Sequence, residues 1–320
     1  MAGALASRAE VEVLVAGGAG AAEEWDGALR IRRFPERRNG RERAALVYRE
    51  VFGVEGAEGG FTNAWIADVS AEVAAELPEL LGREIVAAGG GDSPELFEEL
   101  ADAGFDVVVF CGYRAASTLL GLGEVNERAR KVLVPALREE PELRIPACTA
   151  ALPAVERVLV ATATERDLAA GAGADGARVR EVGLVLRVSE LGRGSEPAGL
   201  PERPYLLVSG DWRLSLPLFD LAALAERARR DLEHVELWFI GREAERVPER
   251  FAAHRRSLYN RMDLWRWMSR ALLVCDPRPH RPFGLDVLEG MLCGAPILVP
   301  DSPGASREHA IRSGGGLWYR

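Results

Sequence analysis

Lysine is almost absent from this chain, because Lys131 is the only lysine among the 40 basic residues. Arginine therefore carries nearly all of the positive charge, and it can stand at positions where a lysine would otherwise serve. Together with the abundance of alanine and glycine, this bias looks like the codon usage of a GC-rich bacterial genome.

Basic residues are also outnumbered by acidic ones. The 49 aspartate and glutamate residues, set against 40 lysine and arginine residues, give a formal net charge of -9 at pH 7. A general nucleic-acid-binding protein needs a basic face that neutralises phosphates. We therefore expect no nucleic-acid partner, and we interpret the local arginine cluster between Arg30 and Arg38 as solvated surface.

Long apolar runs are missing as well. None approaches the roughly 20 residues that a membrane-spanning helix needs. Glu10 and Glu12 interrupt the apolar start of the chain, which is unlike a signal peptide. We expect a cytoplasmic location. The basic stretch Arg246–Arg256 leaves open a peripheral contact with the inner face of a membrane, although a solvated helix face is the favoured interpretation.

Cysteine is scarce, and no two cysteines form a CxxC pair. The four are Cys111, Cys148, Cys275 and Cys293, and their wide spacing favours small buried hydrophobic side chains over disulfides or metal ligands. The chain also has no HExxH motif and no Cys/His ligand spacing. We therefore expect no metal site and no cofactor.

The chain of 320 residues is too long for one comfortable core and suits two domains. Short apolar runs alternate with helical patterns, which predicts parallel strands joined by crossover helices. We predict an α/β protein made of two Rossmann-like, doubly wound parallel-sheet domains that face a cleft. The predicted domains are residues 1–188 and 204–320, separated by a linker at 189–203 that is rich in Gly, Ser and Pro.

In the first half, Ser93 or Asp92 caps a predicted helix that has Pro94 in its first turn. Thr164 and Asp167 have the spacing of a capping box at the start of the predicted helix Glu165–Ala170. Phe105–Cys111 is expected to be a fully buried strand. The other predicted strands are Val11–Val15, Arg30–Phe34, Lys131–Pro135, Val158–Ala161 and Val179–Leu186.

The second half repeats the alternation of strands and helices. Its predicted strands are Tyr205–Ser209, Val235–Ile240, Ala271–Cys275 and Pro296–Val299, and its predicted helices are Leu218–Arg229, Asp263–Ser269 and Phe283–Leu292. Because ligands of open α/β sheets lie at the carboxyl ends of the strands, the loops that follow these strands are the expected site.

The segment Cys275–Pro300 carries the most informative pattern. A strand ends at Cys275, a Pro-rich loop follows, and a helix begins near Phe283. The free amides of the first helical turn form an anion site that suits a diphosphate. Glu289 lies within two turns of that site, where its carboxylate can accept two hydrogen bonds from a ribose diol. The alternative is an ordinary strand–loop–helix crossover.

This segment resembles the donor-binding signature E-P-F-G-L-x-x-L-E-A-M-A-C-G-x-P-V of the retaining glycosyltransferases of family 4, which have the two-Rossmann GT-B fold. The matching residues are Pro282, Phe283, Gly284, Leu285, Leu288, Glu289, Met291, Cys293, Gly294 and Pro296. The first half is also similar to bacterial members at Gly27–Pro35, Phe105–Tyr113 and Val134–Pro141. The likeness therefore covers most of the chain.

The resemblance implies the transfer of a sugar from a nucleotide-diphosphate-sugar donor to a hydroxyl group of a saccharide or lipid-linked acceptor. It further implies retained anomeric configuration, a hexosyltransferase type of activity, no required metal, and a role in cell-envelope or polysaccharide biosynthesis. Preorganised cations and amides would stabilise the leaving diphosphate. The leaving phosphate oxygen would take the acceptor proton, so no separate general base is required.

The site residues follow from the same resemblance. Those assigned to catalysis are Glu289, Arg213, Arg281 and Arg138. Those assigned to donor binding are Gly210, Phe283, Gly284, Leu285 and Glu289. Glu139 and Glu140 are placed on the acceptor side, and His280 and His309 fall near the donor region.

Several positions depart from the family pattern. Arg281 replaces a glutamate that contacts the donor sugar, and Arg138 replaces a histidine. In the loop after Ser209, which normally supplies two cations to the diphosphate, Arg213 is the only candidate. By the same comparison, the usual first strand and the usual last helices are expected to be missing, which predicts a fragment, a misplaced start or a diverged paralogue. Two alternatives therefore stay open, namely a catalytically degenerate GT-B module that acts as a partner protein and a sugar-nucleotide epimerase.

Overall fold

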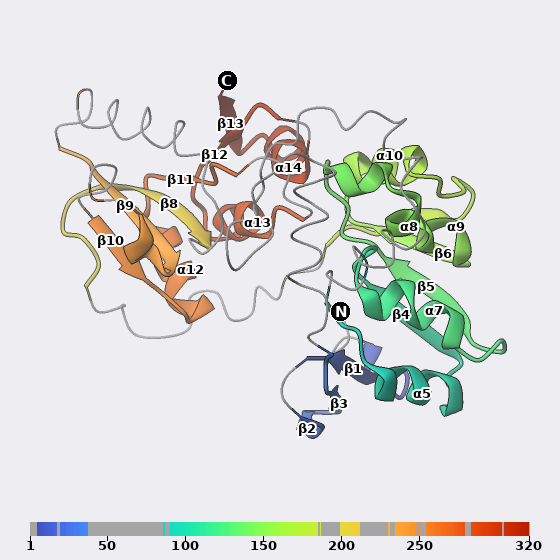
Figure 1. Cartoon of the computed structure of the whole chain (residues 1–320). Coiled ribbons are helices and arrows are strands. Elements are labelled where there is room, and N and C mark those ends of the chain that lie inside the picture. The colour runs from blue at the N-terminus through green and yellow to red at the C-terminus, as the bar shows by residue number, and fades with distance from the viewer. Residues whose placement is uncertain are drawn as a thin grey trace. The chain divides into compact units, whose positions relative to one another are not determined.

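The computed structural model describes residues 5–17, 20–37, 86, 90–184, 186, 199–211, 230, 234–247, 249, 254–278, 283–302 and 304–319 (Figure 1). These residues divide into two compact units, of which the first runs to residue 184 and the second begins at residue 186. The predicted linker at 189–203 falls mostly outside the described residues. In the part of the chain that is described, no helix is long and apolar enough to cross a membrane.

The second unit contains one parallel sheet of six strands. Its strands are β8 (Tyr205–Asp211), β9 (Glu236–Arg242), β10 (His254–Ser257), β11 (Leu273–Cys275), β12 (Ile297–Pro300) and β13 (Gly316–Tyr319). They lie in the order β10-β9-β8-β11-β12-β13. The chain therefore runs outward from β8 to β10, returns to the middle, and runs outward again from β11 on the other side. This is the strand order of a doubly wound Rossmann-like sheet, and the winding reverses between β8 and β11.

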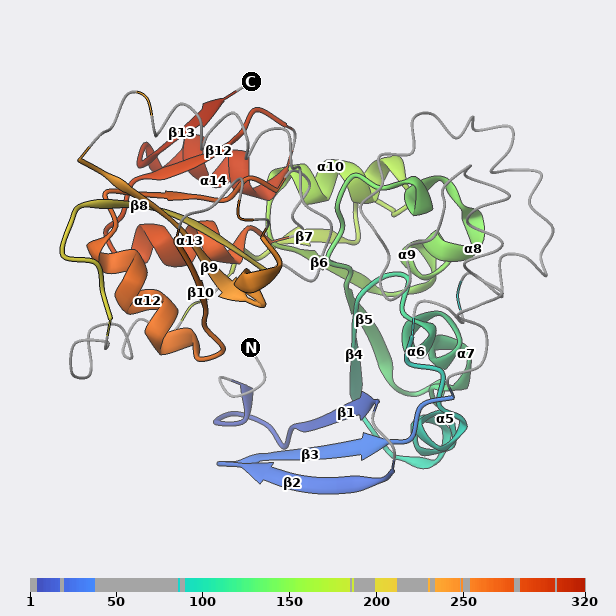
Figure 2. The same ribbon diagram turned by 60° about the vertical axis from the view of Figure 1, so that its left-hand side comes forward.

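Three helices of the second unit lie side by side (Figure 2). They are α12 (Arg261–Arg270), α13 (Leu285–Leu292) and α14 (Ala305–Ser313), and a 3-10 turn, η3 (Ala244–Arg246), precedes β10. The middle helix, α13, contacts both of its neighbours. Trp267 and Met268 of α12 and Val287 of α13 are fully buried in one core with strand residues such as Leu207 and Ile297. This apolar face holds α13 against the sheet.

The described end of the stretch 246–256 differs from the solvated helix face that the sequence suggested, and residues 248 and 250–253 lie outside the described residues. Its last residues enter β10, which pairs in parallel with β9. The His254 ring stacks on Trp238 of β9 with the ring centroids 4.8 Å apart, and Arg255 Nη1 donates to the Val247 carbonyl at 2.8 Å. These contacts outweigh the weak strand pattern of the sequence HRRS. The predicted helix Leu218–Arg229 lies outside the described residues.

The described residues of the first unit form two sheets rather than one. The strands β1 (Glu12–Ala16), β2 (Ala22–Asp26) and β3 (Leu29–Phe34) lie in the order β1-β3-β2, and β4 (Val107–Cys111), β5 (Arg130–Val134), β6 (Arg157–Val160) and β7 (Val179–Glu181) lie in sequence order. Pairing is parallel except between β2 and β3. The helices are α5 (Pro94–Asp102), α6 (Ala116–Leu119), α7 (Gly121–Glu124), α8 (Pro146–Thr149), α9 (Ala151–Ala154) and α10 (Ala163–Gly171), with a 3-10 turn, η1 (Pro141–Arg144).

The expectation that Phe105–Cys111 is fully buried is wrong. Val107 and Val109 of β4 are 51% and 40% exposed, whereas Phe110 is buried. The reason is that β4 is the edge of its sheet, and none of the described strands pairs with its outer side. Cys111, at the end of the same strand, is exposed too, although Cys148 and Cys275 are buried as expected, and all four cysteines are free.

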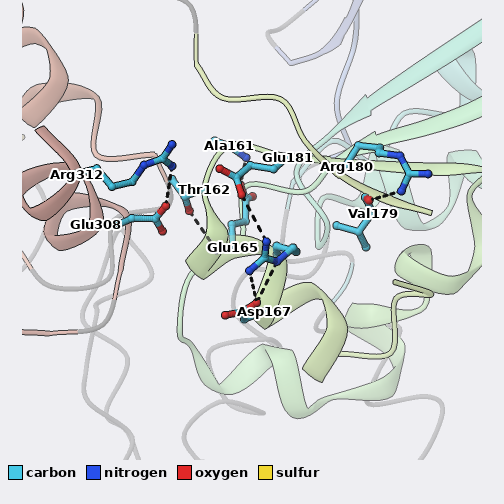
Figure 3. A network of polar contacts seen from close by, with 10 residues as sticks. Ala161, Thr162, Glu165, Asp167, Val179, Arg180, Glu181, Glu308 and Arg312 are labelled. Atoms are coloured by element: carbon cyan, nitrogen blue, oxygen red, sulfur yellow. Dashed lines mark hydrogen bonds and ion pairs between the residues drawn. The ribbon is translucent and has the colours of Figure 1, made fainter. Parts of the chain in front are cut away.

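The capping residue predicted for α5 is confirmed, whereas the one predicted for α10 is wrong by two positions. Ser93 caps α5 by accepting from the Leu96 amide, as predicted. The cap of α10 is Thr162 rather than Thr164, and Glu165 takes the place expected for Asp167 (Figure 3). The buried Glu165 carboxylate accepts from the Leu137 amide at 2.8 Å and from the Ala161 amide at 2.6 Å. It therefore joins the loops that follow β5 and β6.

We predict that Glu165→Ala lowers the free energy of unfolding by about 2–5 kcal/mol, because two buried amides lose their acceptor. Urea denaturation measures the loss. Asp167→Ala is the matched control, since Asp167 lies in the same helix with an exposed side chain, and it should change stability by less than about 0.5 kcal/mol. Equal losses in both variants would contradict the assignment of Glu165.

Candidate functional site

The carboxyl ends of β8 and β11 flank the reversal of winding in the second unit. At the end of β8, Gly210 lies beside Gly241 of β9, and a Cβ atom on Gly241 would stand 1.8 Å from the Gly210 carbonyl oxygen. Gly241 has φ of 134°, a conformation that favours glycine. The predicted donor-binding residue Gly210 is thus part of a close backbone approach at this edge. Arg213, further along the loop, lies outside the described residues.

A buried ion triad fixes the start of the loop that follows β11. Arg278 Nε donates to Asp276 Oδ1 at 2.7 Å, and Arg278 Nη2 donates to Asp286 Oδ2 in the first turn of α13. The Arg278 side chain is only 5% exposed. Burial lowers the pKa of Arg278, but the two carboxylates outweigh it, so the pKa lies above its ordinary value. The triad ties the end of β11 to the beginning of α13.

The sequence did not predict this triad. The spacing of its three residues matches no known motif, and an arginine in a Pro-rich loop is expected to be exposed. Asp276 Oδ2 and Arg278 Nη1 are buried without a hydrogen-bond partner. The triad therefore leaves one carboxylate oxygen and one guanidinium nitrogen unpaired in the interior of the loop.

The start of α13 lies where the sequence suggested. Its N-cap is Gly284, with φ of 57°, and no side chain caps the first turn among the described residues. His309 Nε2 lies 3.0 Å from the Phe283 carbonyl oxygen. The predicted donor-binding residues Phe283, Gly284 and Leu285 thus form the uncapped turn into α13, and their role remains a prediction. Arg281 and His280 lie outside the described residues.

Glu289 is buried in the second turn of α13, with 2% exposure. Both Nε and Nη2 of Arg261, at the start of α12, contact Glu289 Oε1. The other oxygen, Oε2, has no hydrogen-bond partner, and neither does the buried Trp265 Nε1. Burial raises the pKa of Glu289, and the hydrogen bond and charge of Arg261 offset part of this rise. The expected ribose ligand is therefore already paired with an arginine, and its binding role stays a prediction.

In the first unit, Arg138 and Glu140 lie together after β5. Arg138 Nε donates to Glu140 Oε2 at 2.6 Å, and the Tyr113 hydroxyl donates to Glu140 Oε1 at 2.6 Å. Burial and the Glu140 charge raise the pKa of Tyr113 well above its usual value. Glu139, the remaining predicted residue, is exposed.

Arg114 completes this cluster by pairing with the buried Glu142. Tyr113 and Arg114 follow β4, so the cluster gathers residues from the carboxyl ends of two neighbouring strands, β4 and β5. Sequence reasoning gave Tyr113 no role, although it closes the segment Phe105–Tyr113 on which the resemblance partly rests.

The sequence itself matches no protein-family model and no curated protein. The structure, in contrast, is similar to solved structures over nearly its whole length. It matches a trehalose-phosphate synthase from Burkholderia xenovorans in complex with glucose-6-phosphate with a TM-score of 0.66 and 13% identity, over 96% of this chain and 79% of the other.

Two further structures show the same likeness. A sucrose-phosphate synthase from Thermosynechococcus elongatus matches with a TM-score of 0.64 and 14% identity, over 99% of this chain and 77% of the other. HepE from Anabaena, in complex with UDP-glucose, matches with a TM-score of 0.51 and 18% identity, over 68% of this chain and 65% of the other. Identities this low establish the fold alone. The chain has the GT-B fold of two Rossmann-like domains.

We predict that Gly284→Ala destabilises the protein more than Gly294→Ala. Both glycines have positive φ, and left-handed backbone costs an alanine about 1–2 kcal/mol. At Gly284 the new methyl group would also stand 3.1 Å from His309 Cδ2 and 3.2 Å from Ser306 Cα, whereas nothing lies within 4 Å at Gly294. Crowding should add about 1–3 kcal/mol. Urea denaturation compares the two, and equal losses would refute the close packing of this turn.

We also predict a pH effect from His309. Burial lowers its pKa, an effect that the hydrogen bond to the Phe283 carbonyl offsets in part. A depressed pKa in the folded state means that the contribution of His309 to stability is present above its ordinary pKa and is lost as the pH falls through the lowered pKa. His309→Gln, which keeps an N–H donor, should reduce the loss of stability between pH 7 and pH 5. Unchanged pH dependence in thermal unfolding would contradict this.

Proposed function

We propose that the chain is a retaining glycosyltransferase of the family 4 type. It transfers a hexosyl group from a nucleotide-diphosphate-sugar donor to a hydroxyl group of a saccharide or lipid-linked acceptor, in cell-envelope or polysaccharide biosynthesis. The observation that carries the proposal is the combination, on α13, of an uncapped first turn and the buried carboxylate of Glu289. Both follow the strand at which the winding of the sheet reverses.

The donor diphosphate binds at the first turn of α13. The amides of Phe283 to Leu285 and the positive end of the helix dipole favour an anion there. Leu285 and Glu289 are separated by four residues, which corresponds to about 6 Å along the helix axis. A nucleotide whose diphosphate contacts the first turn can therefore place its ribose near Glu289. Two similar structures support a donor and an acceptor of this class, because they are complexes with UDP-glucose and with glucose-6-phosphate.

The chemistry requires stabilisation of the leaving diphosphate as the glycosidic bond breaks. Arg213 and Arg281 are the cations that the resemblance assigns to the donor. The departing phosphate oxygen takes the proton of the acceptor hydroxyl, so that the acceptor oxygen forms a bond on the same face of the sugar. In the first unit, Arg138, Glu139 and Glu140 contact the donor sugar or the acceptor. The ion pair between Arg138 and Glu140 fixes the guanidinium in place for this contact.

A second candidate function is a catalytically degenerate GT-B module that acts as a partner protein. The pairing of Glu289 with Arg261 favours it, because this contact satisfies a carboxylate that an active enzyme offers to the nucleotide. The replacements at Arg281 and Arg138 favour it as well. Such a module would bind nucleotide weakly or not at all.

We predict that a nucleoside diphosphate raises the melting temperature of the full chain and that Glu289→Ala abolishes the shift. UDP, GDP and ADP are screened in turn. Glu249→Ala is the control, because it removes an exposed carboxylate from the same unit, and it should leave the shift intact. A Glu289→Ala variant that binds as well as the parent contradicts the site, and a parent that binds none of the three favours the degenerate module.

Product analysis then separates transfer from other reactions of the donor. Incubation with the nucleotide-sugar and no acceptor should give slow release of free sugar by hydrolysis. Conversion to an isomeric nucleotide-sugar would instead identify an epimerase and contradict the proposed transfer.

A further inference from the structure

The contact between Arg261 and Glu289 is strongly asymmetric. Glu289 is 2% exposed, whereas the Arg261 side chain is 53% exposed. Releasing the arginine into water costs little, because an exposed guanidinium is well solvated. Leaving the buried carboxylate without a donor costs far more. The pair can therefore open only when another donor takes the place of Arg261.

The Glu289 carboxylate can accept more hydrogen bonds than Arg261 donates to it. Both contacts of Arg261 go to the same oxygen, Oε1, and Oε2 has no hydrogen-bond partner. An ionised carboxylate can accept about four hydrogen bonds. Two adjacent hydroxyl groups would supply one donor to each oxygen, which satisfies Oε2 for the first time and replaces the arginine at Oε1.

Arg261 also differs from Arg278, a second arginine that contacts α13. The charge of Arg278 is balanced by Asp276 and Asp286, and its side chain is 5% exposed, so it cannot turn toward a ligand without breaking the loop. Among the contacts of the described residues, those of Arg261 go to Glu289 alone. Once released, its charge is uncompensated and lies about one helical turn from the first turn of α13.

We propose that Arg261 is a placeholder cation that exchanges partners when the donor binds. In the free protein its guanidinium holds the Glu289 carboxylate. In the complex the ribose hydroxyls take Glu289, and the guanidinium turns to the diphosphate at the first turn of α13. The inference rests on the proposed function, and it assigns to Arg261 a contact with the diphosphate that the sequence-based prediction gave to Arg213.

A purely structural role is the alternative. Arg261 joins α12 to α13, and a clamp between helices would stabilise the fold without responding to phosphate. However, Trp267 and Met268 of α12 already pack in the same buried core as Val287 of α13. The two roles differ in one measurable respect, since only partner exchange makes the effect of Arg261 depend on the charge of the ligand.

The test compares a nucleoside diphosphate with its parent nucleoside by isothermal titration calorimetry on the full chain. The diphosphate is whichever of UDP, GDP and ADP gives the largest thermal shift. Arg261→Ala should weaken diphosphate binding about ten- to a hundredfold, the range typical of a lost charge-assisted hydrogen bond. It should leave nucleoside binding unchanged or tighter, because the competitor for Glu289 is gone. Arg261→Lys should recover part of the diphosphate affinity.

Arg266→Ala is the matched control, since it removes an arginine from the same helix that pairs locally with Asp263. It should change neither affinity. Equal weakening of diphosphate and nucleoside in Arg261→Ala identifies a structural clamp and overturns the exchange. No change in either ligand overturns it too. A parent that binds neither ligand overturns the proposed function together with the exchange, so the two failures are distinguishable.

Discussion

The reversal of winding between β8 and β11 is the constraint on which the second unit depends. From the middle of the parallel sheet, β9 and β10 follow β8 toward one edge, and β12 and β13 follow β11 toward the other edge. Ligands of open α/β sheets bind at the carboxyl ends of the strands where the winding reverses in this way. The chain must then leave β11 by a loop that can enter α13 at this edge. The triad of Asp276, Arg278 and Asp286 supplies the rigidity for that turn, and the positive φ of Gly284 allows its last step.

Two buried charged residues near this turn, Arg278 and Glu289, differ in whether their partners can be replaced. Arg278 is held by Asp276, which follows β11, and by Asp286 in the first turn of α13, so it serves to join these two elements. Glu289 is held from one side by an arginine that is half in solvent, and one of its oxygens lacks a partner. A buried group whose partner is exposed and replaceable can exchange that partner for a ligand, whereas Arg278, held by Asp276 and Asp286, has no exposed partner to give up. This contrast is why the proposed ligand contact lies at Glu289 and Arg261 rather than at Arg278.

Local patterns predicted much of the fold. The Ser93–Pro94 cap of α5 and the strand–loop–helix passage from Cys275 to α13 follow from residues adjacent in sequence. Contacts between distant residues were not predictable in this way. The strand β10 has the polar sequence HRRS and is recognised only by its pairing with β9. The exposure of Val107 results from the edge position of β4 rather than from its apolar run. Likewise, the partner of Glu289 is Arg261, which lies in another helix and 28 positions away in the sequence. No sequence motif indicates that these two residues form a pair.

The central claim is that Glu289 binds the ribose of a nucleotide whose diphosphate contacts the first turn of α13. A crystal structure of the chain with a bound nucleoside diphosphate tests it most directly. The account predicts ribose hydroxyls within hydrogen-bond distance of Glu289 and phosphate oxygens at the amides of Phe283 to Leu285. A nucleotide bound elsewhere, with Glu289 still paired only with Arg261, would contradict it.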